Sequence, residues 1–496
     1  MEIFNHILLG FHTALSLGNL IYCFLGVVLG TFVGVIPGLG PVATMSILMP
    51  ITLNISPVSA IIMFAGIYYG ALYGGSTTSI LINVPGEVTS VVTCIDGYQM
   101  AIKGRAGPAL SISAIGSFIG GTISLIGVMF LAAPLAKFGL RFGPPEYFAL
   151  IFLALTVVSG VATGSPIKAL SAAALGMLTG VIGMDMHTGI PRFTLGIRTL
   201  YDGVGLVPVT MGLFGISEIF INIEKKIEIE ILKSKIERIL PSVQDWIDSR
   251  WAILRGTLIG FFVGIIPGGG ALLSTFASYV IEKKISPHPE KFGYGAIEGV
   301  AGPETANNAA GQASFIPMLA LGIPSNVVIA VLIGTLMIHG VQPGPLLISE
   351  HPEIFWGVIT SMYIGNAMLL VLNLPLIRLW IQLLKIPYTF LFPIILLFCL
   401  IGVYSLNNNV IEIFIMVFFG IIGYFMRKLE FEPAPFVMGM VLSPMMENAF
   451  RQSLTLSDGK ITILFTRPIS ALLMIVGLSA LTFYVISWIR RQRDRY

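Results

Sequence analysis

Long apolar runs, separated by short polar segments, follow one another along almost the whole chain. They cover about residues 18–53, 57–94, 107–135, 146–164, 166–184 and 204–222, and then 251–281, 305–340, 353–384, 387–402, 408–426, 434–448 and 461–488. A helix of about 20 apolar residues can cross the hydrocarbon core of a bilayer. The pattern therefore predicts an all-α polytopic integral membrane protein with about 10–14 membrane segments, some of them broken or re-entrant.

One charged stretch divides these runs into two groups. Its sequence IEKKIEIEILKSKIERIL is typical of a polar helix that lies outside the membrane. We therefore expect a first membrane half (1–222), a charged cytoplasmic linker (223–250), a second membrane half (251–489) and a basic cytoplasmic tail (490–496). The tail RRQRDRY carries four arginines, and such residues favour the cytoplasmic side of a membrane.

The composition agrees with this pattern. Apolar residues make up 55% of the chain, charged residues 11%, and the mean hydropathy is +0.90. A soluble protein of this length could not cover so much apolar surface in one core. The start MEIFNH lacks the basic region of a cleaved signal peptide, so we expect Met1 to remain in the mature chain. Cys23, Cys94 and Cys399 are isolated and form neither a disulfide nor a metal pattern.

Two stretches of fifteen residues, 230 positions apart, resemble each other closely. GVVLGTFVGVIPGLG (26–40) and GTLIGFFVGIIPGGG (256–270) are identical at nine positions. Their glycines at every fourth residue are typical of membrane helices that pack closely against a neighbour. We interpret these glycines as packing residues rather than ligand contacts.

Each of these stretches is followed by a second apolar run that proline interrupts. These runs are YGGSTTSILINVPGEVTSVV (73–92) and NNAAGQASFIPMLALGIPSNVV (307–328), and each precedes a methionine and then a Gly-Pro pair. Three landmarks in the same order predict a duplicated unit. We expect inverted copies, because duplicated broken helices usually have that arrangement. The charge count favours parallel copies, since linker and tail both look cytoplasmic.

The proline and glycine positions predict helix breaks at membrane depth, since proline removes a backbone donor and glycine permits non-helical angles. A broken helix inside a bilayer must be buried in protein or line a water-filled cavity, so the breaks predict a site; a surface turn is the alternative. The residues in question are Pro37, Gly38, Gly40, Pro85, Gly86, Pro267, Gly268, Gly269, Gly270 and Pro324.

Neutral polar residues cluster next to the breaks. Hydroxyls and amides can bind a carboxylate, and helix N-termini add partial positive charge, so no arginine is required. Alternatively, these side chains bond their own helix backbone. The predicted substrate-binding residues are Ser76, Thr77, Thr78, Asn83, Asn307, Asn308 and Ser325.

Two acids lie near the breaks. Glu87 follows the first Val-Pro-Gly, and Glu304 precedes the Asn307–Asn308 pair. An acid at membrane depth is a candidate for a proton or cation pathway. Either acid could instead lie at the membrane interface as a first-turn helix acid.

Motifs for an enzyme are weak. Gly38-Leu-Gly40-Pro-Val-Ala43 resembles a nucleotide fingerprint but lacks a soluble strand before it and an acid at the right distance. Asp185 and His187 are two ligands in a loop, too few for a metal centre. We expect no enzymatic activity, no metal, no cofactor other than a coupling cation, and no nucleic-acid partner.

Several ordered motifs together resemble the large membrane subunit of the tripartite tricarboxylate transporters. They are GVIPGLGP, STTSILINVPGE, DGYQMAIKGRAGPAL, GMDMHTGIPRFTLG, PETANNAA and LMIHGVQPGPLL, between about residues 20 and 350. This resemblance implies a permease of a bacterial or archaeal cytoplasmic membrane that imports carboxylates such as citrate, driven by a sodium or proton gradient. Its implied partners are a small four-helix membrane subunit and an extracytoplasmic solute-binding protein.

One position departs from the family pattern. The chain has Ile323-Pro324-Ser325 where similar proteins have Ile-Pro-Gly. Serine resists left-handed angles by about 1 kcal/mol, so we expect a differently shaped second break.

These observations together predict a secondary active carboxylate permease with a midplane site shared by the two halves. A passive anion channel and a non-transporting assembly or receptor protein remain the alternatives.

Overall fold

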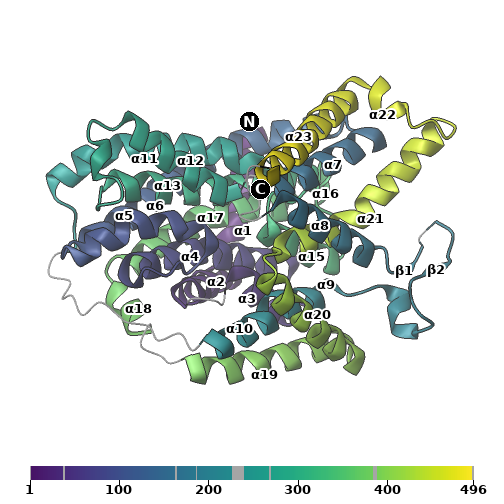
Figure 1. The fold of residues 1–496 in the computed structure, drawn as a ribbon, viewed down its shortest axis with the longest axis horizontal. Coiled ribbons are helices and arrows are strands. Elements are labelled where there is room, and N and C mark those ends of the chain that lie inside the picture. The colour runs from purple at the N-terminus through teal and green to yellow at the C-terminus, as the bar shows by residue number, and fades with distance from the viewer. Residues whose placement is uncertain are drawn as a thin grey trace.

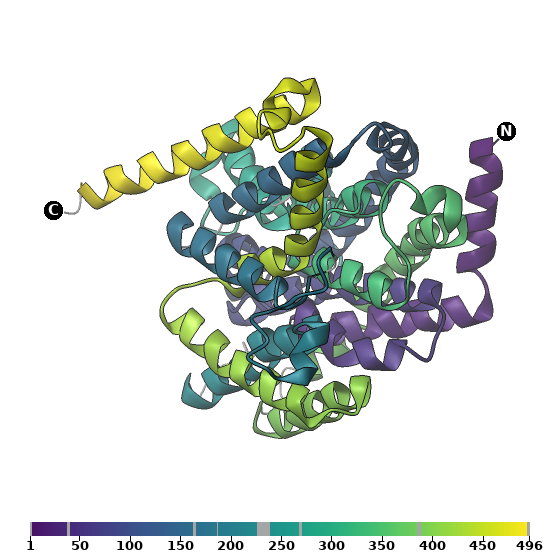
Figure 2. The same cartoon turned by 90° about the vertical axis from the view of Figure 1, so that its right-hand side faces the viewer.

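The computed structural model describes residues 2–36, 40–161, 165–185, 187–225, 239–266, 270–383 and 388–493. In these ranges the chain is almost entirely helical (Figure 1). One two-stranded antiparallel hairpin, formed by β1 (Gly183–Met184) and β2 (Pro191–Arg192), projects at the right-hand edge of Figure 1. Figure 2 shows α1 (Glu2–Ala14) and α23 (Pro468–Arg493), with the two chain ends, on opposite sides of the molecule.

The part before the linker contains, after α1, the following elements: α2 (Leu17–Val35), α3 (Pro41–Thr52), α4 (Pro57–Ile82), η1 (Val88–Ser90), α5 (Val91–Ile102), α6 (Ala106–Gly139), α7 (Pro144–Val161), α8 (Pro166–Gly180), η2 (Arg198–Asp202), α9 (Leu206–Thr210), η3 (Met211–Ile216) and α10 (Ser217–Lys225).

The part after it contains α11 (Val243–Ile265), α12 (Gly270–Ile285), η4 (Pro289–Lys291), α13 (Glu298–Ala313), α14 (Phe315–Leu321), α15 (Val327–Ile338), α16 (Leu347–Glu350), α17 (Pro352–Asn373), α18 (Ile377–Leu383), α19 (Tyr388–Asn407), α20 (Val410–Lys428), α21 (Pro433–Leu456), α22 (Ile463–Thr466) and α23. α11 begins at Val243, inside the range expected for the linker, and most of the predicted polar linker helix lies outside the described residues.

The helices confirm an all-α polytopic membrane protein. Seven of them within the described ranges are long and apolar enough to cross a membrane: Leu17–Val35, Pro57–Ile82, Ala106–Gly139, Leu206–Glu224, Pro352–Asn373, Val410–Lys428 and Pro468–Trp488. Shorter apolar helices cover Pro41–Thr52, Pro144–Gly160, Val327–Ile338 and Phe392–Asn407.

The glycine ladders pack helices together, as their spacing predicts. A Cβ atom added at Gly30 of α2 would overlap the backbone of Ile67 in α4. A Cβ atom added at Gly260 of α11 would likewise overlap Ala306 in α13. Without side chains at these positions the helix backbones come into direct contact, which maximises packing in the absence of water.

Both ladders end in a break whose described flanks have the same backbone geometry. α2 ends at Val35 and α11 at Ile265, and the next helices begin at glycines with φ of 50°, Gly40 before α3 and Gly270 in α12. This angle favours glycine, because other L-residues meet a steric penalty there. The predicted break residues between these helices lie outside the described residues: Pro37, Gly38, Pro267, Gly268 and Gly269.

The second pair of breaks also shares one geometry, which corrects the expectation for Ser325. Asn83 and Gly322 take up the left-handed conformation, with φ of 56° and 71°, and each is followed two residues later by Pro85 or Pro324. Ser325 has no positive φ. Since the left-handed angle falls on Gly322, serine at position 325 causes no strain.

The short helices leave the breaks toward two opposite edges. α5 and α12 run to one edge, where Asp96 accepts hydrogen bonds from Tyr279 Oη (2.9 Å) and from the backbone after α12. We call this the linker edge, because Arg105 at the end of α5 pairs with Asp245 at the start of α11. α3 and α15 run to the opposite edge, where Thr52 Oγ1 lies 3.4 Å from His339 Nε2. In Figure 1, α5 lies at the left and β1–β2 at the right.

Candidate functional site

A cavity of about 910 Å³ lies where the broken helices meet. Its wall contains the starts of α3, η1, α12 and α15, through residues Gly40–Ala43, Glu87–Thr89, Gly270–Leu272 and Asn326–Val328. Four helical segments that lie far apart in the sequence therefore direct their first turns toward one space. The first turns of helices carry unpaired N–H groups and about half a positive charge, so their convergence favours an anion.

Two side chains at equivalent positions cap these starts. The Glu87 carboxylate accepts a hydrogen bond from the N–H of Thr89 (2.9 Å), and Asn326 Oδ1 accepts one from the N–H of Ile329 (3.0 Å). Asn326 also donates from Nδ2 to Tyr68 Oη at 3.1 Å, which ties α15 to α4 across the cavity. Each cap satisfies one helix donor and fixes the angle at which the helix leaves the break.

The remaining wall comes from helices outside the two broken units. Phe214, Glu218 and Asn222 line it from η3 and α10, Arg427 from α20, and Pro433–Pro435 from the start of α21. Among the described lining residues Arg427 is the one cation, and its guanidinium pairs with the Glu218 carboxylate. This ion pair uses the positive charge, and the carboxylates of Glu87, Glu430 and Glu432 also line the cavity. Attraction for an anion would therefore have to come from the helix N-termini.

The residues singled out from the sequence fall into two groups. Six of those described line the cavity: Gly40, Pro85, Gly86, Glu87, Gly270 and Ser325. The others lie outside its lining: Ser76, Thr77, Thr78, Asn83, Glu304, Asn307, Asn308 and Pro324. Asn83 is exposed at the end of α4, and the other seven residues are buried in the protein.

The hydroxyl cluster of α4 makes contacts within the protein. Thr78 and Ser79 donate to the backbone oxygen of Gly75, at 2.9 and 3.0 Å, as hydroxyls in helices commonly do. Ser76 donates to the carboxylate of Glu304 in α13. The cluster therefore connects α4 with the second half of the chain.

α13 carries buried amides with few partners. Asn308 Nδ2 donates to Ser117 Oγ of α6 at 2.7 Å, but Asn308 Oδ1 has no partner among the described residues. Both polar side-chain atoms of Asn307 and of Gln312 are also buried without a partner there. A buried amide without a hydrogen-bond partner lowers the stability of the folded protein. Packing alone therefore does not explain why α13 carries these amides.

Sequence reasoning missed several lining residues. Tyr68 lies in an apolar run with no polar neighbour in sequence, and Glu218 and Arg427 come from helices 209 positions apart. Asn326 gave the clearest signal, because it directly follows Ile-Pro-Ser and precedes an apolar helix, as an N-cap does.

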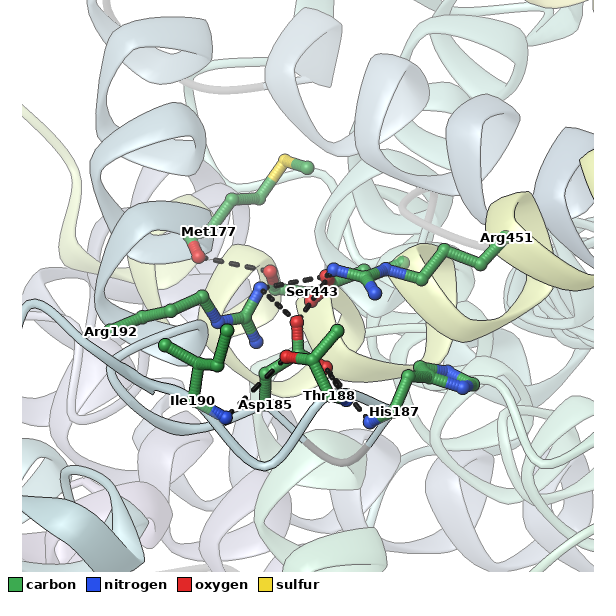
Figure 3. A network of polar contacts seen from close by, with 9 residues as sticks. Met177, Asp185, His187, Thr188, Ile190, Arg192, Ser443 and Arg451 are labelled. Atoms are coloured by element: carbon green, nitrogen blue, oxygen red, sulfur yellow. Dashed lines mark hydrogen bonds and ion pairs between the residues drawn. The ribbon is translucent and has the colours of Figure 1, made fainter.

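The Asp185–His187 motif builds a charged network on the hairpin rather than a metal pair. Figure 3 shows Asp185 between Arg192 and Arg451, with Asp185 Oδ2 2.8 Å from Arg451 Nη2. The N–H of His187 donates to Asp185 Oδ1 at 2.8 Å and holds the carboxyl pKa at about 2, helped by the N–H of Thr188 and by Arg451. These contacts fix the hairpin to α21.

Helices long and apolar enough to span a membrane, together with broken helices whose first turns line one cavity, are typical of a transport protein of the permease class. The chain belongs to the Tripartite tricarboxylate transporter TctA family, whose model matches residues 20–438. It is therefore a tricarboxylate transporter permease subunit.

Two relatives come from Agrobacterium vitis. An "uncharacterized 52.8 kDa protein in TAR-I ttuC' 3'region" is 48% identical over 495 residues, covering 100% of this chain and 99% of the relative. A second protein, from the TAR-II ttuC' 3'region, is 48% identical over 236 residues, covering 48% of this chain and 98% of the relative. No solved structure matches the chain.

Proposed function

We propose that this permease subunit carries small carboxylates into the cell through the cavity at the helix breaks. It works with a small four-helix membrane subunit and an extracytoplasmic solute-binding protein, and a sodium or proton gradient drives accumulation. The observation that carries this proposal is the convergence of four helix starts on one cavity of about 910 Å³. Backbone N–H groups can neutralise carboxylates there without a lysine or a free arginine.

The substrate contacts in this proposal differ in part from those the sequence suggested. Carboxylate groups bind the first turns of α3, α12 and α15, with Asn326 and Tyr68 as side-chain donors. Ser325 also lines the cavity, but its hydroxyl donates to the backbone oxygen of Ser314 at 3.2 Å. Ser76, Thr78 and Asn308 make internal hydrogen bonds and act behind the cavity wall.

We also propose that residues 17–139 and 243–373 are inverted copies of one unit. Corresponding helices support this, because α3 and α12 leave the cavity toward opposite edges, and so do α5 and α15. Three helical passes lie between the units, namely α7, α8 and α9–α10, and an odd number of passes turns the second unit over. In this proposal the charge count does not decide the orientation, because it compares whole halves, which contain more than the unit.

The linker edge is the cytoplasmic side in this proposal, and the membrane is the inner membrane of a bacterium or archaeon. Lys103, Arg105, Lys283 and Lys284 lie at the ends of α5 and α12 on that edge. Positive residues in short loops favour the cytoplasm.

Uptake of labelled citrate and other small carboxylates into proteoliposomes tests the proposal. The vesicles contain this chain and its small membrane subunit, with the binding protein outside, and an inward sodium or proton gradient is imposed or omitted. Accumulation above equilibrium that disappears with the gradient supports a coupled importer. Equilibration that ignores both gradients indicates a channel, and no flux with an assembled complex indicates a non-transporting protein.

A further inference from the structure

Glu304 is a buried acid without a cation beside it. Its side chain in α13 is 1% exposed, and no ion pair within the described chain involves it. The polar partners of its carboxylate in the described chain are hydroxyls: Ser76 of α4 donates to Oε2, Thr93 of α5 to Oε1, and Ser113 of α6 is a third partner. Because an uncompensated charge at this depth is costly, the site favours a carboxylate that has taken up a positive charge.

The surroundings suit a proton as that positive charge. A hydroxyl can donate a hydrogen bond to a carboxylate or accept one from a carboxylic acid. Ser76 and Thr93 can therefore hold both forms of Glu304 by rotating their O–H bonds. A divalent metal ion usually takes several carboxylates, and no three His, Cys, Asp or Glu side chains that could hold a metal ion gather among the described residues.

A stripe of polar residues connects Glu304 with the cavity. Thr93 follows Glu87 and Ser90 at intervals of three residues, so the three share one face of η1 and α5. Ser90 Oγ donates to the backbone oxygen of the cavity residue Glu87 at 2.7 Å. Ser79 Oγ of α4 donates to the backbone oxygen of Ser90 at 3.0 Å.

The same stripe continues from Glu304 to the linker edge. Asp96 lies three residues beyond Thr93, and its carboxylate accepts hydrogen bonds from Tyr279 Oη (2.9 Å) and the N–H of Gly295 (2.7 Å). Glu304 thus lies between the cavity and that edge, where α4, α5 and α13 meet.

Other titratable groups around Glu304 come from several elements. Tyr73 of α4, Cys94 of α5 and Glu87 before η1 interact with its charge. α6 presents the hydroxyls of Ser113 and Ser117, while Arg255 of α11 and Glu282 of α12 pair with each other.

We propose that Glu304 takes up and releases the proton that is coupled to carboxylate transport. This inference rests on the proposed function. A proton from the cavity side adds to the Glu304 carboxylate, and the resulting acid later loses that proton toward the linker edge, so no other bond forms or breaks. Transport of the carboxylate anion and movement of the proton are linked because Ser76 and Thr93 belong to α4 and α5, the two helices on either side of the break at Pro85.

The experiment compares Glu304→Gln with the parent protein in the proteoliposomes described above, using labelled citrate. Glutamine keeps the shape of the acid and can bond to both hydroxyls, accepting from one and donating to the other, but it does not titrate. We expect accumulation driven by an inward proton gradient to fall by about tenfold or more. Exchange of internal for external citrate without a gradient should remain within about twofold of the parent value, since no net proton movement is required.

Glu290→Gln is the matched control, because Glu290 is an exposed acid at the linker edge. It should behave like the parent protein. Glu304→Asp, which retains a titratable group, should restore part of the accumulation. If Glu304→Gln does not fold, infrared spectroscopy of the parent and of Glu304→Asp provides a second measurement: the parent must show a carboxylic-acid band that the shorter side chain shifts.

Several results would overturn the inference. Normal proton-driven accumulation by Glu304→Gln would show that the acid does not carry the proton. Loss of exchange together with accumulation in a folded variant would indicate a substrate or structural role. Sodium-driven accumulation, lost in the variant, would assign a sodium ion to the site. Absence of any citrate flux in the parent would instead contradict the proposed function itself.

Discussion

The two breaks that follow α4 and α14 share a backbone and differ in their side chains. Each begins with a left-handed residue, Asn83 or Gly322, continues through proline, and ends in a side chain that caps the next helix. The cap is the acid Glu87 in the first break and the amide Asn326 in the second.

The difference extends behind the cavity wall. Counting from the equivalent breaks, Glu304 in the second unit corresponds to Ala65 in the first, and both are buried. The backbone geometry therefore serves a purpose common to both units, which is to present helix starts to the cavity. The acids do not follow this symmetry, because Glu87 belongs to the first unit and Glu304 to the second, at positions that do not correspond.

The largest effect is expected from substitutions in the glycine ladders of the two units. Gly30→Leu and Gly260→Leu should each destabilise the protein by about 3 kcal/mol, because a side chain forces α4 away from α2 or α13 away from α11. Thermal unfolding in detergent measures the loss. Gly18→Leu is the control, since a Cβ there has nothing within 4 Å. A large loss in only one unit would break the equivalence of the ladders.

Exchanging the residues that follow the two prolines should have unequal effects. Gly86→Ser should cost about 2 kcal/mol, because its Cβ would overlap the backbone of Gly34 and Thr78 Oγ1. Ser325→Gly should cost about 1 kcal/mol, since it loses one hydrogen bond to the backbone oxygen of Ser314 (3.2 Å). The same unfolding assay distinguishes them, and equal losses would mean that the two breaks have the same packing.

Changing Asn326 to glutamate would give both breaks an acidic cap. The capping bond remains possible, but one more carboxylate, added to Glu87, Glu218, Glu430 and Glu432 in the cavity lining, repels an anionic substrate, so citrate exchange should fall by about tenfold. Asn326→Ser keeps a cap without charge and should retain most of the exchange activity. Equal activity of the two variants would show that substrate does not approach Asn326.

The smallest effect is expected outside both units, in the hairpin. The hairpin depends on ion pairs, which the described residues of the breaks after α4 and α14 lack. The Asp185 carboxyl has a pKa of about 2, below its ordinary value of 3.8. Its contribution to stability is therefore complete above about pH 4 and is lost as the pH falls toward 2. Hydrogen exchange of residues 183–192 should differ between the parent and Asp185→Asn near neutral pH and converge in acid. A difference that persists in acid would contradict this origin.

Much of the fold follows from patterns that a single sequence contains. Apolar run length predicts the spanning helices, and the glycine spacing predicts close helix packing, which the structure has between α2 and α4 and between α11 and α13. The breaks were predicted at Pro85 and Pro324, where the structure has them. Local chemistry explains this success, since proline and glycine act on the backbone of their own segment.

The cavity side chains were harder to predict, because their role depends on distant partners. Ser76 belongs to a polar cluster that appeared suited to substrate, yet its partner is Glu304, 228 positions away. Tyr68 lies among apolar residues and reaches the cavity only because Asn326 lies opposite. Which face of a fully buried helix meets which neighbour cannot be read from hydropathy, since every face is enclosed.

α4 also has a consequence for how the chain enters the membrane. It has the lowest mean hydropathy of the seven spanning candidates, 1.4, and is 94% buried, whereas the last one, Pro468–Trp488, has the highest, 2.3, and is 17% buried. A helix that other helices surround in the folded protein can carry serine and threonine. Such a helix partitions only weakly into lipid when it first leaves the ribosome. α2 precedes it in synthesis and already presents the glycine face that α4 covers, so the biogenesis of α4 depends on a helix inserted moments earlier.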